Sequence, residues 1–311
     1  MVALKTPIQI LLCADEGYIH QSFVVALSVL KHMQQDRALT VHFVYCHDAT
    51  KSGAYSIAAY CDQLSKTYPS CTFNIIEFDV TSMFHGENRL HISAATLARL
   101  IPTRWLSGKV LYLDADLVVL DDVVPLFDTD LAGKLMGVVR SYDLMFYARK
   151  ARYKEKKTKF YRHAETILGA DHAEDYFNAG VLLLDLDAWA ARDVDAKLAA
   201  RNYGQDLHLR DQDVLNQVAL GDVKFLHGRW NAIKGWAFLK RAGADVPYRD
   251  EWEGCYKAPA IAHFAGRKKP WQYRNFNWFR PYYKWIKLYR AYWNELVVVM
   301  AGTGASLKDK V

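Results

Sequence analysis

Two carboxylates, Asp114 and Asp116, follow one apolar stretch and precede another. The first stretch, from Val110 to Asp114, is typical of a strand that is buried in a sheet. Two charges between apolar stretches are costly to bury unless a cation meets them. Carboxylate oxygens at this spacing can both bind one divalent ion, and a polar turn after the strand is the alternative. The pair alone leaves both interpretations open.

A second acidic cluster is Asp211-Gln-Asp213. Taken alone, either carboxylate can simply cap the helix that the pattern predicts up to Leu220. Arg99 lies on another predicted helix, just ahead of the strand that ends at Asp114. Its guanidinium can meet a carboxylate or a phosphate near that strand, or it can lie in solvent.

The third chemical feature is His263, which ends a short apolar stretch and is followed by Gly266, Lys268 and Lys269. A single histidine is more often structural than a ligand. An imidazole beside a glycine and two lysines nevertheless suits a site for phosphate and metal.

Alternating strands and helices must position these residues. We expect strands at 8–14, 41–46, 72–78, 110–114, 135–139 and 176–185, and helices at 18–33 and 54–68. This alternation predicts right-handed crossovers and a mainly parallel sheet, with nucleotide bound at the carboxyl ends of the strands. The irregular, basic segment 140–175 is typical of a lid or binding loop. Because GxGxxG and GxxxxGK[ST] are absent, dehydrogenases and P-loop ATPases are disfavoured.

The 311 residues, 51% of them hydrophobic and 24% charged, are enough for a large core. We expect one elaborated domain, or one domain with a small C-terminal appendage. Five cysteines lack CxxC spacing, and Cys13, Cys46 and Cys71 lie in or beside apolar runs, which indicates buried thiols in a reducing, cytoplasmic setting. We find no secretory signal, and no run approaches the ~18 apolar residues that span a membrane.

The formal net charge of +6 is concentrated in two stretches. Between Arg267 and Arg290, eight basic residues and no acidic ones are interleaved with aromatic rings, and a second basic run spans 149–159. These stretches favour an acidic partner, either anionic lipid headgroups or nucleic acid. A helical subdomain whose rings pack on the main domain is the alternative for the aromatic stretch, and both can hold together.

Six blocks in a fixed order make the chain resemble glycosyltransferase family 8 over about residues 8–272. The blocks are Ala14-Asp15 with Tyr18, His91-Ile-Ser with Ala98-Arg99, Leu113-Asp-Ala-Asp116, Phe177-Asn-Ala-Gly180, Asp211-Gln-Asp213, and His263-Phe-Ala-Gly266 with Lys269-Pro-Trp271. The resemblance, strongest to bacterial lipopolysaccharide and lipooligosaccharide galactosyl- and glucosyltransferases, implies the GT-A fold. This is an α/β fold with a Rossmann-like mixed sheet that binds a nucleotide sugar and is flanked by helices. We therefore expect a GT-A domain at 1–265 and a helical, basic-aromatic extension at 266–311.

The resemblance further implies a UDP-sugar donor and a Mn²⁺ ion, with Mg²⁺ as the alternative. Asp114, Asp116 and His263 match the metal ligands, and two carboxylates with one imidazole suit Mn²⁺ better than Ca²⁺. The positions that match nucleotide contacts are Ala14, Asp15, Tyr18, His91, Ile92, Ala115, Gly266 and Lys269. The positions that match catalytic and donor-sugar residues are Arg99, Asn178, Asp211, Gln212 and Asp213, with Asp143 as a further acid.

The implied reaction moves galactose or glucose from a UDP-hexose to a glycan hydroxyl, with retention and an α-glycosidic product. Gln212 would lie beside the anomeric carbon, where an amide is a poor nucleophile, and Asp213 is the less favoured candidate for a covalent intermediate. The expected acceptor is a lipopolysaccharide core. This places the protein in the cytoplasm, peripherally bound to the inner membrane through 267–293.

Three alternatives stay open at this point. A self-glucosylating protein of the glycogenin type lies within the same family. An aspartyl-phosphate phosphatase also has Asp-x-Asp after an apolar strand, although there the motif follows the first strand. A basic surface that stacks nucleic-acid bases would leave both acidic clusters unexplained, so we expect no nucleic-acid partner.

Overall fold

The computed structural model of the chain describes residues 6–34, 37–47, 54–79, 94–141, 159–199, 211–233, 248–253, 255, 257–266, 268–272 and 283–301. The predictions for His91, Ile92 and Asp143 lie outside the described residues, as does segment 142–158 of the predicted lid.

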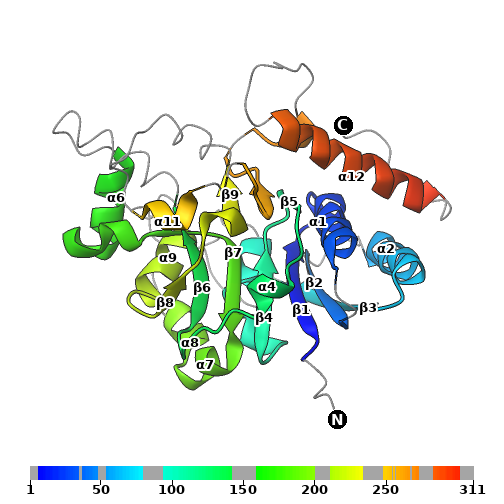
Figure 1. Ribbon diagram of the computed structural model, residues 1–311. Coiled ribbons are helices and arrows are strands. Elements are labelled where there is room, and N and C mark those ends of the chain that lie inside the picture. The colour runs from blue at the N-terminus through cyan, green and yellow to red at the C-terminus, as the bar shows by residue number, and fades with distance from the viewer. Residues whose placement is uncertain are drawn as a thin grey trace, which may run out of the picture.

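A seven-stranded mixed sheet lies at the centre of the described chain, in the order β3-β2-β1-β4-β7-β6-β8 (Figure 1). Its strands are β1 (Ile8–Ala14), β2 (Leu39–His47), β3 (Cys71–Asp79), β4 (Lys109–Leu113), β6 (Met136–Arg140), β7 (Phe177–Asp185) and β8 (Val223–Phe225). β1 pairs in parallel with β2 and β4, whereas β7 runs antiparallel between β4 and β6. The predicted mixed sheet is confirmed, and β1 has the predicted bounds.

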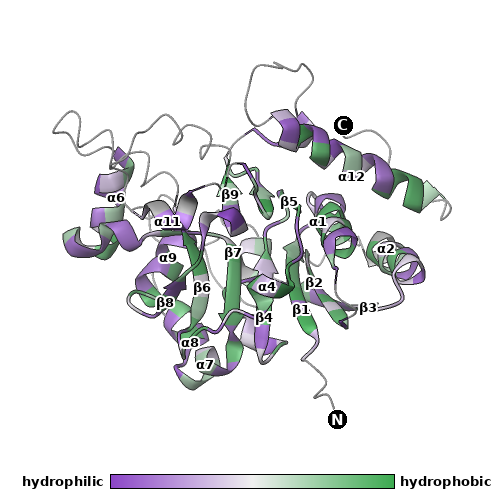
Figure 2. Cartoon of the chain, in the orientation of Figure 1, coloured by the Kyte–Doolittle hydropathy of each residue, from purple (hydrophilic) through white to green (hydrophobic). Residues whose placement is uncertain are grey.

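The central strands are apolar on both faces because helices cover both faces of the sheet. On β4, Leu111 and Leu113 pack into one core, and Val110 and Tyr112 pack into the opposite one. The first core is covered by α1 (Ile19–His32) and α2 (Ala54–Thr67), and the second by α3 (Ala94–Ala98), α7 (Leu186–Ala191), α8 (Val194–Ala199) and α9 (Asp211–Val218). Figure 2 shows the result as mostly hydrophobic strands between helices with polar outer faces.

A small second sheet carries residues of the candidate site. Its order is β5-β10-β9, formed by β5 (Leu117–Val119), β10 (Ile261–His263) and β9 (Ala232–Ile233). β10 runs antiparallel to β5, so His263 lies opposite Leu117, the residue after Asp116. This register brings the histidine and the Asp-x-Asp pair together across nearly half of the chain.

The C-terminal helix α12 (Tyr283–Ala301) lies along the edge of the molecule beside α1 and α2 (Figure 1). Trp285, Tyr289 and Trp293 are buried in the same core as the residues of α1. An ion pair joins Lys31 of α1 to Glu295 of α12, with 2.6 Å between nitrogen and oxygen. These rings therefore pack inward, as the second interpretation of the aromatic stretch predicts. Among the described residues, no helix is long and apolar enough to cross a membrane.

The remaining described elements are short. They are α4 (Val124–Phe127), α6 (Lys159–Leu168), α11 (Arg249–Trp252) and the 3-10 helices Pro102–Arg104, Ala170–Asp175, Gly228–Asn231 and Pro270–Gln272.

Candidate functional site

Asp114 and Asp116 lie at the carboxyl end of β4, on the connection between the two sheets. The backbone N–H of Asp114 donates to the carbonyl of Gly180 on β7 (2.9 Å), and the carbonyl of Asp116 accepts from the N–H of Phe264 (2.9 Å). The backbone of each aspartate is thus held by a neighbouring segment.

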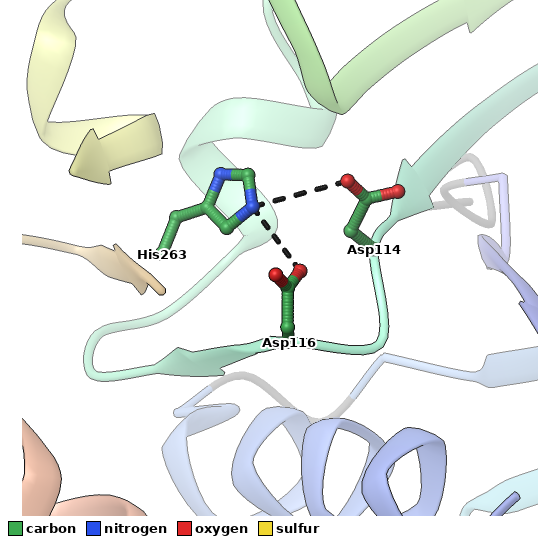
Figure 3. Close-up of side chains that lie close together, drawn as sticks. All are labelled: Asp114, Asp116 and His263. Carbon is green, nitrogen blue, oxygen red and sulfur yellow. Dashed lines mark hydrogen bonds and ion pairs between the residues drawn. The ribbon is translucent and has the colours of Figure 1, made fainter. Parts of the chain in front are cut away.

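The His263 ring points toward both carboxylates (Figure 3). Its Nε2 lies 3.1 Å from Asp116 Oδ1 and 3.8 Å from Asp114 Oδ2. One ligand atom from each of the three residues lies within 4.8 Å of the other two. Two hard oxygens and one borderline nitrogen converging on one point form a donor set that fits a divalent transition metal. The residues predicted to hold Mn²⁺ are thus close enough together to do so.

Gly180 leaves the room that this cluster needs. A Cβ atom built on Gly180 would lie 2.8 Å from His263 Nδ1 and 2.9 Å from Asp114 Oδ2, and closer still to His263 Cε1. Any side chain at residue 180 must therefore displace the imidazole, the carboxylate or the strand. The backbone of β7 therefore approaches the cluster closely at this glycine.

We expect Gly180→Ala to weaken Mn²⁺ binding by about 10- to 100-fold, because the added methyl group pushes His263 and Asp114 apart. Overpacking should also lower the free energy of unfolding by about 1–3 kcal/mol. Titration of the protein with Mn²⁺, followed by electron paramagnetic resonance, measures the first effect. Gly133→Ala is the control for a glycine outside the site, and unchanged metal affinity in Gly180→Ala would contradict the packing argument.

The Lys269 ammonium contacts the carboxylate of Asp116 and also lies 3.3 Å from the carbonyl oxygen of Phe264. Burial alone would raise the pKa of Asp116, but His263 and Lys269 beside it hold that pKa well below its usual value. Asp116 is therefore an anion, and a cation already lies against it. Gly266 precedes this lysine with a φ of 109°, a backbone conformation that favours glycine.

Arg99 joins the two acidic clusters. Its guanidinium donates to Asp114 Oδ1 (3.0 Å) and to the carbonyl of Ala179 (3.2 Å), and it forms an ion pair with Asp211. The Tyr112 hydroxyl also donates to Asp114 Oδ1, at 2.6 Å. Arg99 and Asp211 are both buried. Of the two interpretations left open for Arg99, the carboxylate partner is observed.

Asn178 and Gln212 form a row of amides beside the carboxylates. Asn178 Nδ2 donates to Gln212 Oε1 (3.1 Å), and Gln212 Nε2 donates to the Tyr176 hydroxyl (3.1 Å). Both amide side chains are partly exposed, so they can also meet a ligand. Asp213 is instead fully buried (0% exposed), and its Oδ1 lies 2.5 Å from the Tyr176 hydroxyl and 2.8 Å from His163 Nε2. This carboxylate is positioned as an internal anchor.

The end of β1 supplies the residues predicted to meet the nucleotide. Asp15 Oδ1 accepts from the N–H of Gly17 (3.0 Å), which forms a tight turn that leads into α1. The exposed ring of Tyr18 lies edge-on to Trp271, with 5.8 Å between centroids. Trp271 in turn packs against Tyr289 of α12 at 5.5 Å. The C-terminal helix thus supports the ring on which a base could stack.

The arrangement of sheet and helices is that of the GT-A glycosyltransferases. The structure of the galactosyltransferase LgtC in complex with donor and acceptor sugar analogs superposes with a TM-score of 0.69 at 26% identity, over 93% of this chain and 96% of that one. The bifunctional glycosyltransferase WbbM shares the fold with a TM-score of 0.71 at 18% identity, over 96% of this chain and 52% of that one.

The sequence model of Glycosyl transferase family 8 matches residues 9–275, so the chain belongs to this family and is a transferase. Curated relatives span most of its length. General stress protein A of Bacillus subtilis (strain 168) is 25% identical over 91% of this chain and 94% of its own. Probable galacturonosyltransferase-like 3 of Arabidopsis thaliana is 28% identical over 85% of this chain and 74% of its own. Membership in the family confirms the resemblance and excludes the alternative that the chain is an aspartyl-phosphate phosphatase.

The structure gathers the described members of the predicted site at one corner, while their roles stay predictions. Sequence reasoning missed four polar neighbours of these residues, which are Tyr112, His163, Tyr176 and Asn231. Tyr112 could have been found, because it lies two residues before Asp114 on a strand and so shares its face. No pattern around His163 or Asn231 singles them out.

Proposed function

We propose that the chain transfers galactose or glucose from a UDP-sugar to a hydroxyl of a glycan acceptor, with retention and an α-glycosidic product. The observation that carries this proposal is the convergence of Asp114, Asp116 and His263 beside Lys269. Two carboxylates and an imidazole thus lie beside a lysine, whose charge sits at the end of a flexible side chain. The cluster is at the carboxyl end of β4 in a GT-A fold. Such a corner suits a metal ion and the diphosphate of a nucleotide sugar together.

Asp114, Asp116 and His263 would hold Mn²⁺, with Mg²⁺ as the alternative. Held by these residues, such an ion would neutralise the charge that builds on the departing diphosphate. Lys269 would leave Asp116 for a phosphate oxygen, since its flexible stem and single charge suit either anion. Asp15 and Tyr18 would hold the uracil, Ala14 and Ala115 would line the nucleotide, and Gly266 would offer its backbone.

On the sugar side, Arg99, Asn178, Asp211 and Gln212 would contact the donor hexose. Retention then proceeds by attack of the acceptor hydroxyl on the face that UDP leaves, with a leaving-group oxygen as base. The burial of Asp213 supports this route over a covalent intermediate. Burial and the neighbouring Asp213 raise the pKa of Tyr176, so its phenol stays a donor that occupies this carboxylate.

A panel of UDP-sugars with Mn²⁺, scored by release of UDP with and without a glycolipid acceptor, tests the proposal. We expect release from UDP-galactose or UDP-glucose, loss of release in excess EDTA, and stimulation by acceptor. UDP-galacturonic acid belongs in the panel because of the plant relatives, and a preference for it would overturn the hexose assignment. Full turnover in EDTA would overturn the metal assignment.

The lipopolysaccharide core as acceptor, the cytoplasmic face of the inner membrane and peripheral binding through 267–293 stay predictions. Lys287 and Leu288 are exposed on α12, on the side away from the buried rings, and are available to a lipid surface. Co-sedimentation of the full chain with anionic vesicles tests this. For self-glucosylation, mass spectrometry that finds no hexose on any tyrosine after incubation with donor would exclude the glycogenin-type alternative.

A further inference from the structure

Asn231 lies in the centre of the site and is as buried as a core residue, with 1% of its surface exposed. It ends the 3-10 helix before β9 and makes two side-chain hydrogen bonds. Its Oδ1 lies 2.8 Å from His263 Nδ1, and its Nδ2 donates to Asn178 Oδ1 at 2.8 Å. One amide thus touches a metal ligand on one side and a donor-sugar residue on the other.

The direction of these hydrogen bonds follows from two backbone N–H groups. The N–H of Ala179 donates to the Gln212 side chain (3.0 Å), and the N–H of Gly180 donates to the Asn178 side chain (3.0 Å). A backbone N–H can only donate, so the atom that it meets in each amide must be the oxygen. The two backbone N–H groups of β7 therefore determine which end of each amide is the oxygen and which is the NH₂ group.

The orientation of the Asn231 amide is determined by its hydrogen bond to Asn178. The Asn178 oxygen can only accept, so Asn231 must present its NH₂ group there and its oxygen to His263. The Asn231 oxygen in turn requires a proton on His263 Nδ1. A proton on Nδ1 leaves Nε2 as the ring nitrogen that lies toward Asp114 and Asp116, where an ion would bind it. Two consecutive backbone groups of β7 thereby select the nitrogen that faces the metal site.

The same chain continues away from the metal site. Gln212, with its oxygen held by Ala179 and Asn178, presents its nitrogen to the Tyr176 hydroxyl, which donates to the buried Asp213 carboxylate. An unbroken series of hydrogen bonds therefore runs from His263 to Asp213. Each donor in it is fixed by its neighbour, and such networks rigidify a site when every member is satisfied.

We propose that Asn231 is a positioning residue that couples the metal site to the donor-sugar site, by holding the His263 ring through Nδ1 and holding Asn178. This rests on the proposed function for the identity of the two ligands, but the two hydrogen bonds of Asn231 do not. Outer hydrogen-bond partners of metal-bound histidines change metal affinity by about 10- to 100-fold. Asn231 has the contacts of such a partner and adds a second contact toward the sugar.

Two variants separate its two bonds. Asn231→Ala removes both, whereas Asn231→Asp keeps an oxygen for His263 Nδ1 and loses the donor to Asn178. Asn216→Ala is the matched control, since Asn216 is also 1% exposed and bonds through both ends of its amide to Phe177 and Gln212. The readouts are Mn²⁺ affinity by electron paramagnetic resonance and donor turnover.

We expect Asn216→Ala to keep the Mn²⁺ affinity of the native protein. Mn²⁺ affinity should fall about 10- to 100-fold in Asn231→Ala and stay near native in Asn231→Asp. Turnover should fall about tenfold or more in both Asn231 variants, because Asn178 loses its support. Native Mn²⁺ affinity in Asn231→Ala, or equal loss of metal affinity in Asn231→Ala and Asn216→Ala, would overturn the inference.

The Mn²⁺ affinities are measured without donor or acceptor. A set of variants with the expected Mn²⁺ affinities but no turnover of any UDP-sugar would leave the role of Asn231 standing and refute the proposed reaction.

Discussion

Asp116→Asn is expected to reduce Mn²⁺-dependent release of UDP from the donor by about a thousandfold. The amide removes the charge that His263 and Lys269 both meet, and it offers the ion a weaker ligand in place of a carboxylate. The effect is large because the charge on a departing diphosphate has to be neutralised during the reaction. Initial rates at saturating Mn²⁺ measure it.

Fold and charge need separate controls in this experiment. Asp121→Asn makes the same chemical change five residues further along, where the carboxylate pairs with Arg229 at a partly exposed position. This control should keep native activity, and both variants should keep native circular dichroism. A variant of Asp116 that retains more than about a tenth of the native rate would refute the metal assignment.

The fold could be predicted because its signals are local. Ile8–Ala14 is apolar at every position but Gln9, which is the pattern of a strand covered on both faces, and β1 has those bounds. Asp114 and Asp116 stand out for the same reason, since charges that end such a run must be explained. Sequence periodicity thus indicates both the sheet and the position of its carboxylates.

The rest of the site depends on pairings that no local pattern encodes. Nothing in Ile261-Ala-His263 says that this strand pairs antiparallel with β5 and not with another strand, so only the family resemblance predicted that His263 lies beside Asp114 and Asp116. Asn231 is harder still, because its role depends on the orientations of side chains from β7 and β10. Hydrogen bonds between distant side chains are selected by the fold as a whole.

In the aromatic stretch near the C-terminus, residue spacing predicts more than composition does. Its composition fits a membrane surface and a packed helix equally well, and composition alone favoured neither. Its spacing carries more information, since Trp285, Tyr289, Trp293, Leu296 and Met300 recur every three or four residues. That is one face of a helix, and this face is buried against α1. Attention to spacing would have favoured packing for these rings.

Arg99→Ala is expected to lower the free energy of unfolding by about 3–5 kcal/mol, since it leaves the buried Asp211 and the half-buried Asp114 without their cation. The Arg99 guanidinium meets Asp114 on one side and Asp211 on the other, and its planar fork is what allows one side chain to serve both. Urea denaturation of the metal-free protein measures the change. Arg99→Lys should lose less stability, because the ammonium retains the charge but cannot reach both partners equally.

The combination with Asp211→Asn shows whether unpaired charge is the cause. If the cost of Arg99→Ala comes from the carboxylate left behind, then neutralising Asp211 in that background should restore about 1–3 kcal/mol. Asp211→Asn alone should destabilise, because it takes a partner from a buried arginine. Losses that simply add in the double variant would mean that the two residues act independently. Their ion pair would then not be what joins the two acidic clusters.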